Sequence, residues 1–431
     1  MNRHEMAQYC LDTLKKNGAD KAQCSITETA KHELNIDAGA MSLFRTTFNT
    51  IVSLLVIKDG KKGTLAINKT DKDALNNAIV AVMELAQSSN ADDANDIADV
   101  KVCKQFTAGD DKPQLDRMYE RFQEFLAYNQ ATYPFTNLEQ SIFDFTKTEN
   151  VFMNSHGVDF TVTDGIYNFN AMFTSKDGEK MSSFNGTGAS HRTLDIPLKE
   201  WGAADRLLKE SAEQITTQSF ADKFVGDVII TPFALGDFIG ALAGVALDDF
   251  SLITKTSPYM EKLNQKIASD VFTLHSRPVS GEIEDGYYYT GDGFEAQNMT
   301  IIDKGVLKSY LLGLYGAKKT GRARSVNVGG AFVVDPGHES FETLVKSVKR
   351  GIILGRFSGG NPNDNGDFSG VAKNSYYIEN GKIQFPITET MIAGNVIEMM
   401  LKIRSISAER INFGSAIFPW VVAEGITISG K

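Results

Sequence analysis

Apolar residues recur every three or four positions in two stretches near the start of the chain, and they alternate with polar residues between those stretches. The periodic stretches predict amphipathic helices and the alternating ones predict strands. We expect a helix that ends at Asn17-Gly18, strands at 21–29 and 32–37, a hairpin at 50–69 and a helix at 72–87. Residues 88–99 are polar and acidic, which indicates a loop or linker.

Alternation resumes over residues 141–186 and predicts an antiparallel meander. Its turns are expected where Asn, Asp and Gly cluster, at Asn154–Gly157, Asp164–Gly165 and Asp177–Gly178. A helical pattern at 113–129 precedes the meander, and a long helix at 198–218 closes this half of the chain.

The second half opens with an apolar strand and then the stretch TPFALGDFIGALAGVALDDF (231–250), which reads as a helix with almost no reactive side chain. Later elements are hairpins around Asp303–Gly305 and Asn380–Gly381, helices at 340–351 and 395–406, and strands at 352–357 and 419–430. Because strands and helices do not alternate regularly, the pattern favours an α+β fold. We expect two domains, 1–220 and 221–431, with mixed or antiparallel sheets, flanking helices and a candidate sub-boundary near 88–112.

Composition narrows the classes of partner. The chain has 431 residues and a formal net charge of -10, and this acidic balance argues against nucleic acid, which requires a basic surface. The two basic segments, 58–63 and 316–324, read as solvated turns. Three cysteines without a CxxC pair indicate a reducing compartment. Since no signal peptide or membrane-length apolar run is recognised, we expect a cytoplasmic protein that does not contact a membrane.

Known catalytic motifs do not occur. None of the three His-Glu dipeptides, at His4, His32 and His338, is followed by the second His of a zinc-peptidase helix. GxSxG and GxxxxGK[ST] are absent as well. The loop 358–370 begins like a calcium loop but has Asn where carboxylates are needed, and Ala372 in place of the final Glu. We therefore expect no catalytic residue and no metal ligand from these motifs.

An independent hydrolase remains the alternative reading. Asp303, Asp367 and Glu379 could supply its acid and base groups, although each also suits an ordinary turn.

Residues 355–403 resemble the most distinctive block of the TldD/PmbA family. The matching motifs are Gly359–Asn363, Gly366–Ser369, Ile378–Gly381 and Ala393–Asn395, and the turn 154–158 also fits the family. The resemblance extends over nearly the whole chain. It implies a PmbA/TldD-like fold and a link to zinc-dependent proteolysis; the family also carries the older label "modulator of DNA gyrase", so a gyrase-modulating binding protein is a further alternative.

The family has two branches, which the resemblance distinguishes by their zinc ligands. TldD-type subunits carry HExxxH on the helix after the strand that opens the second domain, and a Cys late in the chain. The corresponding helix here has Ile239, Gly240, Ala241 and Gly244, and the late segment 411–420 has no Cys. The resemblance therefore implies a PmbA (TldE) subunit that binds no cofactor itself, with zinc in a TldD-type partner. We expect the small residues of this helix to permit close backbone approach.

The same resemblance implies a peptide or unfolded protein as substrate. Because a partner surface that is left empty tends to self-associate, we expect a homodimer when the chain is isolated. Residues proposed to shape a peptide groove or to contact the partner are Gly359, Gly360, Asn361, Asp367 and Asn395. The alternative for this loop is a rigid turn between a strand and a hairpin.

Overall fold

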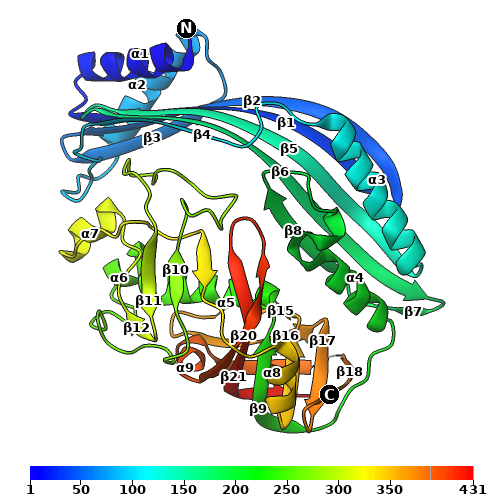
Figure 1. The fold of residues 1–431 in the computed structure, drawn as a ribbon. Coiled ribbons are helices and arrows are strands. Elements are labelled where there is room, and N and C mark those ends of the chain that lie inside the picture. The colour runs from blue at the N-terminus through cyan, green and yellow to red at the C-terminus, as the bar shows by residue number, and fades with distance from the viewer. Residues whose placement is uncertain (361, 389, 431) are drawn as a thin grey trace.

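The computed structural model describes residues 1–360, 362–388 and 390–430, and its two β-sheets divide the chain. In Figure 1 the long strands of the first sheet curve over the C-terminal half of the molecule. The predicted boundary at residue 220 falls between the last helix that packs on the first sheet and the first strand of the second. No helix among the described residues is long and apolar enough to cross a membrane.

The first sheet has eight strands in the order β3-β2-β1-β5-β6-β4, with β7 and β8 also paired to β6. Its strands are β1 (Lys21–Asp37), β2 (Ala40–Lys58), β3 (Lys61–Ile67), β4 (Val102–Ala108), β5 (Thr136–Asn154), β6 (Val158–Asp177), β7 (Lys180–Met181) and β8 (Asn185–His191). β4 runs parallel to β6, so the segment around the candidate sub-boundary belongs to the same sheet as its neighbours.

One face of this sheet is covered by helices. These are α1 (Arg3–Lys16), α2 (Lys72–Ser88), α3 (Leu115–Thr132) and α4 (Ala204–Glu213). Alternate residues of β5 point to this face: Val151 packs with α1 and α2, and Phe143 and Phe145 pack with α3 and α4. The intervening residues of β5, such as Asp144 and Thr146, therefore face the C-terminal half.

Two sequence predictions for the strands of this half are wrong. The strands expected at 21–29 and 32–37 are one continuous strand, β1. Asp164–Gly165 is not a turn, because β6 runs through it and pairs with β5. A Cβ at Gly165 would lie 1.9 Å from the carbonyl oxygen of Asp110, so glycine is needed there for close approach of another segment.

The helix expected at 198–218 is also broken. A 3-10 helix (Leu198–Ala203) precedes α4. The chain bends where the two helices meet, because Gly202 and Ala203 have positive φ angles of 53° and 65°. This bend places Trp201 in the buried aromatic core, where its ring meets that of Phe143 edge-on at 5.8 Å. Burial of the largest side chain outweighs the helical preference of the segment.

The second sheet has thirteen strands. Its main path runs β12-β11-β10-β13-β21-β9-β14-β17-β18, and β15-β16-β19 joins β21 beside it, as does β20. Bounds are β9 (Lys223–Ile230), β10 (Leu274–Ser276), β11 (Met299–Asp303), β12 (Val306–Leu307), β13 (Phe332–Val334), β14 (Arg350–Leu354), β15 (Arg356–Ser358), β16 (Asp367–Lys373), β17 (Ser375–Glu379), β18 (Lys382–Ile387), β19 (Thr390–Asn395), β20 (Ile403–Asn412) and β21 (Ile417–Ser429). The predicted turns at Asp303–Gly305 and Asn380–Gly381 join β11 to β12 and β17 to β18.

The helices of this half are short. They are α5 (Pro232–Leu242), α6 (Asp249–Ile253), α7 (Leu314–Thr320), α8 (Phe341–Ser347) and α9 (Val396–Leu401), with a π-helical turn at Ala243–Leu247. Two expectations need correction. The basic segment 316–324 contributes to helix α7 as well as to a turn, and the helix expected over 395–406 ends at Leu401 because Ile403 and Ile406 are buried in β20.

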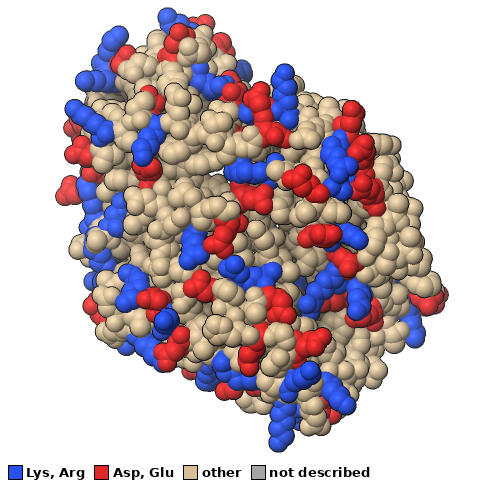
Figure 2. Space-filling model, in the orientation of Figure 1, with Lys and Arg blue, Asp and Glu red and all other residues tan. Residues whose placement is uncertain are grey.

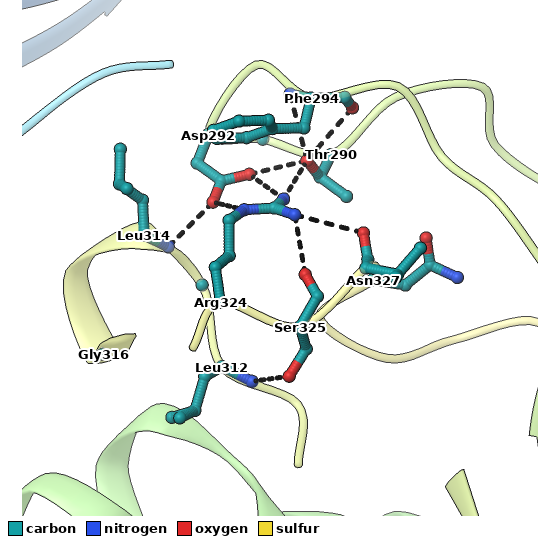
Figure 3. Close-up of polar contacts among 12 residues, drawn as sticks. Thr290, Asp292, Phe294, Leu312, Leu314, Gly316, Arg324, Ser325 and Asn327 are labelled. Atoms are coloured by element: carbon teal, nitrogen blue, oxygen red, sulfur yellow. Dashed lines mark hydrogen bonds and ion pairs between the residues drawn. The ribbon is translucent and has the colours of Figure 1, made fainter. Parts of the chain in front are cut away.

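A segment of the C-terminal half, residues 287–294, connects the two halves. Tyr289 packs between Phe152 and Phe160 of the first sheet, and its hydroxyl donates to Oδ1 of Asn150 at 2.5 Å. Figure 3 shows how Arg324 holds this segment: its guanidinium donates to both carboxylate oxygens of Asp292, at 2.6 and 2.8 Å. The network therefore positions the segment against the first sheet.

The linker after α2 connects the halves through Asp96. Its carboxylate accepts from the ammonium groups of Lys21 in β1 and Lys318 in α7. Burial opposes ionisation of Asp96, but the two ammonium groups outweigh it and hold its pKa at about 2, below the usual 3.8. A depressed pKa stabilises the fold above the unfolded-state pKa, and this contribution is lost as pH falls from about 4 to about 2.

We predict that Asp96→Asn lowers the free energy of unfolding by about 1–2 kcal/mol at neutral pH. The difference from wild type should shrink as the pH falls through the same interval, because the carboxylate of the wild type then becomes protonated. Urea unfolding at neutral pH and at about pH 2 measures both effects. Asp99→Asn is the control, since that carboxylate is 91% exposed; equal effects of the two substitutions would contradict the prediction.

Candidate functional site

Helix α5 follows the central strand β9 and supports the candidate site. The side chain of Thr231 caps its start by accepting from the backbone N–H of Ala234, and Pro232 occupies its first turn, where no N–H is needed. Leu235, Phe238 and Leu242 bury one face of the helix in the core. Its opposite face has glycines, which leaves the helix backbone bare on that side.

That bare face borders a cavity of about 600 Å³. The helix and the turn after it contribute Gly236, Asp237, Gly240, Ala241 and Gly244, and the loop after β15 contributes Pro362 and Asp364. Two regions singled out in the sequence, the small-residue helix and the glycine-rich loop, thus meet in one place. Ile239, by contrast, is in the core with 1% of its surface exposed.

The small residues do not mediate close packing, contrary to our expectation. A Cβ at Gly240 or Gly244 would meet no atom within 4 Å. Both residues are exposed to the cavity, so their role is to leave space beside the helix. Pro362 and Asp364 of the loop after β15 border the far side of this space.

We predict that Gly240→Ala stabilises the chain by about 0.5–1 kcal/mol, because a helical alanine loses less conformational freedom on folding and nothing opposes its methyl group. Chemical denaturation measures the gain. Gly316→Ala in α7 is the matched control, since its Cβ would lie 1.9 Å from Oδ1 of Asp249. That control should destabilise; a loss of stability for Gly240→Ala would show that the helix is packed more tightly than described.

Two of the other predicted groove residues, Asp367 and Asn395, connect the end of the loop to the start of α9. Asn395 donates to Oδ1 of Asp367 at 2.8 Å and caps α9 through its own Oδ1. Gly360 has φ of 88°, and a Cβ there would lie 1.7 Å from the carbonyl oxygen of Ser369. Gly359 has φ of 70° and open space around it. Asn361 lies outside the described residues. None of these four described residues lines the cavity.

The acidic residues of the hydrolase alternative lie on different elements. Asp303 is at the end of β11, Asp367 begins β16 and Glu379 ends β17. None of the three lines the cavity beside α5.

A second cavity, of about 790 Å³, lies between the two halves of the chain. The first sheet contributes polar side chains of β5 and β6, among them Asp144 and Asn170, and the glycine-containing face of β8. The C-terminal half contributes Phe233, Arg356 and Phe413. Gly355 splits the strand predicted at 352–357 into β14 and β15, and this break places Arg356 at the cavity.

Asp237 is the acidic group of α5 that faces the first cavity. Burial raises its pKa above the usual value, while the charge of Arg356 opposes that rise. Within residues 1–360, 362–388 and 390–430, no three His, Cys, Asp or Glu side chains form a group that could hold a metal ion. A zinc ion requires about three protein ligands, and Asp237 alone does not provide them.

The C-terminal half matches a known domain. Residues 224–430 match the PmbA/TldA metallopeptidase C-terminal domain. The chain is also 23% identical over 425 residues to metalloprotease PmbA of Escherichia coli O157:H7, and this alignment covers 93% of the chain and 91% of that protein. The C-terminal half is therefore a domain of the PmbA/TldD family. A metalloprotease PmbA homologue of Haemophilus influenzae is 22% identical over 407 residues, covering 92% of this chain and 89% of the relative.

Solved structures show that the PmbA/TldD fold extends over both halves. TldE from Thermococcus kodakarensis superposes with a TM-score of 0.82 at 19% identity, covering 99% of this chain and 100% of that one. A Bacteroides thetaiotaomicron protein described as a modulator of DNA gyrase gives 0.87 at 22% identity, covering 99% of each chain. These likenesses confirm the predicted α+β fold, and the names of the relatives agree with the predicted PmbA (TldE) branch.

Sequence reasoning missed the second cavity and Arg356. The signal available was a single arginine in an otherwise apolar strand, directly after a glycine. Figure 2 shows acidic and basic side chains interspersed on the face in view, with no continuous basic area there. Arg356 is distinguished by its place beside Phe184 and Phe233 in the second cavity.

Proposed function

We propose that this chain is the PmbA/TldE-like subunit of a TldD-type, zinc-dependent peptidase complex, in which it binds unfolded peptide and the partner holds the zinc. The observation that carries the proposal is the space beside α5. Glycine and alanine line the cavity where TldD-type relatives are expected to place their ligands, and Asp237 is the one acidic group that α5 contributes to it. The site suits an occupant from outside the chain better than a metal held by it.

An extended peptide would have a backbone to pair with. β15 pairs with β16 along one edge, and no other strand pairing is described for it. Its residues lie at both cavities: Phe357 lines the smaller and Arg356 the larger. Addition of a peptide strand to an open edge binds through main-chain hydrogen bonds and tolerates many sequences, as a subunit that handles unfolded peptides requires.

The decisive experiment measures cleavage of an unfolded peptide by the purified chain alone, and by the chain mixed with a TldD-type subunit from the same organism and zinc. We expect cleavage only with the partner present, and its loss on adding a chelator. Cleavage by the chain alone, abolished by the chelator, would overturn the proposal. Metal analysis of the pure chain is an independent check, with less than stoichiometric zinc expected.

The proposal also covers assembly and location. A surface reserved for a partner tends to self-associate when the partner is absent, so the isolated chain is expected to be a homodimer by light scattering. The free thiols of Cys10, Cys24 and Cys103 support a reducing compartment, the cytoplasm.

A further inference from the structure

Arg356 is placed at the larger cavity by its strand. It is the first residue of β15, and it lines the cavity with Phe184 of the N-terminal half and Phe233 of α5. Its guanidinium lies over the ring of Phe184, 4.2 Å from the ring centre. Stacking on an aromatic ring restrains the planar guanidinium. The N–H donors at the edge of the guanidinium then point away from the ring.

The guanidinium has no carboxylate partner among the described residues. Within residues 1–360, 362–388 and 390–430, its one hydrogen bond is a long contact of 3.5 Å from Nη2 to Oγ of Ser183, and its buried Nε has no acceptor. Asp237 attracts the guanidinium through space but forms no ion pair with it. A buried N–H without an acceptor costs free energy. A ligand that supplies an acceptor would remove this cost when it binds.

The basic residue that lines the cavity together with Arg356 is already neutralised. Lys31, which also lines it, pairs with Glu33 at 2.9 Å and Asp144 at 3.2 Å. Arg350, which lies outside the cavity, has both an aromatic and an acidic partner. It stacks over Phe224 at 3.9 Å and pairs with Asp222 at 2.9 Å. Arg356 has the aromatic support of Arg350 without its acidic partner.

The rest of the cavity is suited to a neutral chain. Asn168 and Asn170 present side-chain amides, and Gly186 and Gly188 of β8 present bare backbone. Phe233 and Phe413 add apolar surface from the C-terminal half. An uncharged peptide backbone with one negative group matches these features.

We propose that Arg356 binds a carboxylate of the peptide that occupies the larger cavity, either its C-terminal carboxylate or an acidic side chain. The planar fork of arginine accommodates a carboxylate through two parallel hydrogen bonds. The inference rests on the proposed peptide-binding function and adds a specificity to it: peptides with a carboxylate at this position bind more tightly than otherwise identical neutral ones.

The test compares four fluorescein-labelled, unstructured heptapeptides of Ala, Ser and Thr by fluorescence anisotropy with the full-length chain. One has a free C-terminal carboxylate and one is amidated; two further amidated peptides carry a central Glu or Gln. We expect one of the acid-containing peptides to bind at least about tenfold more tightly than its neutral counterpart, as a charge-assisted pair of hydrogen bonds provides. Which of the two does so identifies the source of the carboxylate.

Arg356→Gln should abolish that preference and leave the affinity of the neutral peptides unchanged. Arg356→Lys, which keeps the charge but loses the fork, should retain part of it. Arg350→Gln is the matched control, because it removes a stacked arginine outside the cavity, and it should preserve the full preference. A melting temperature close to that of the wild type shows that each variant is folded.

Two results would overturn the inference, and they are distinguishable. Equal affinity of the wild type for acidic and neutral peptides would remove the role of Arg356 while leaving peptide binding intact. Absence of binding for all four peptides would remove the proposed function together with the inference. Neither outcome depends on the folding of a variant, because both are measured on the wild type.

Discussion

Replacing Phe169 by alanine is expected to destabilise the N-terminal half by about 3–5 kcal/mol, the usual cost of removing a large aromatic side chain from a core. Phe169 lies on β6 and is fully buried. Its ring contacts Phe125 edge-on at 4.9 Å and is 6.3 Å from both Phe122 and Phe143. The side chain therefore joins α3 to the sheet, and its loss leaves a cavity between them.

The chain allows this effect to be measured for one half alone. It has two tryptophans, Trp201 in the N-terminal core and Trp420 in the C-terminal one. In a Trp420→Phe background, fluorescence during urea unfolding reports on the N-terminal half. Met172→Ala is the control on the same strand, since Met172 is 41% exposed, and it should change stability by no more than about 0.5 kcal/mol. A loss below about 1 kcal/mol for Phe169→Ala would contradict the packing described.

Local sequence patterns predicted those elements in which the alternation of side chains and the turn residues indicate the same structure. The Asn380–Gly381 turn is one, because Asn380 and Gly381 both adopt positive φ between two alternating strands. Asp164–Gly165 has the same type of sequence but lies inside β6, because its glycine accommodates a backbone more than fifty positions away. A local pattern does not distinguish these two uses of glycine.

The candidate site depended still more on distant contacts. The resemblance to the PmbA/TldD family identified α5 and the loop after β15, but not that they line one cavity. Arg356 could not be recognised from its neighbours in sequence, because its surroundings, with no carboxylate partner among the described residues, are set by Ser183, Phe184 and Asp237. Contacts of this range are decided by tertiary packing.

The last prediction concerns Asp292, whose replacement by asparagine should lower the free energy of unfolding by about 2–4 kcal/mol. Its carboxylate accepts from Arg324 through both oxygens and from the backbone N–H of Leu314 at 2.8 Å. Asparagine has one acceptor oxygen, so its amide N–H groups would face donors that remain buried. The side chains of Asp292 and Arg324 are only 20% and 14% exposed, which limits rescue by water.

The pH dependence of this loss separates the charge of Asp292 from its shape. Burial opposes ionisation of Asp292, but hydrogen bonds from Arg324 and Thr290 outweigh it and place its pKa below the usual value. The carboxylate therefore stabilises the fold above the unfolded-state pKa of about 4, and this contribution disappears as pH falls below it. The penalty of Asp292→Asn, measured by urea unfolding, should be greatest near neutral pH and should decrease on acidification. Asp303→Asn, at an exposed turn, should be neutral throughout. A penalty for Asp292→Asn that does not vary with pH would show that the shape of the side chain, and not its charge, holds the segment that joins the two halves.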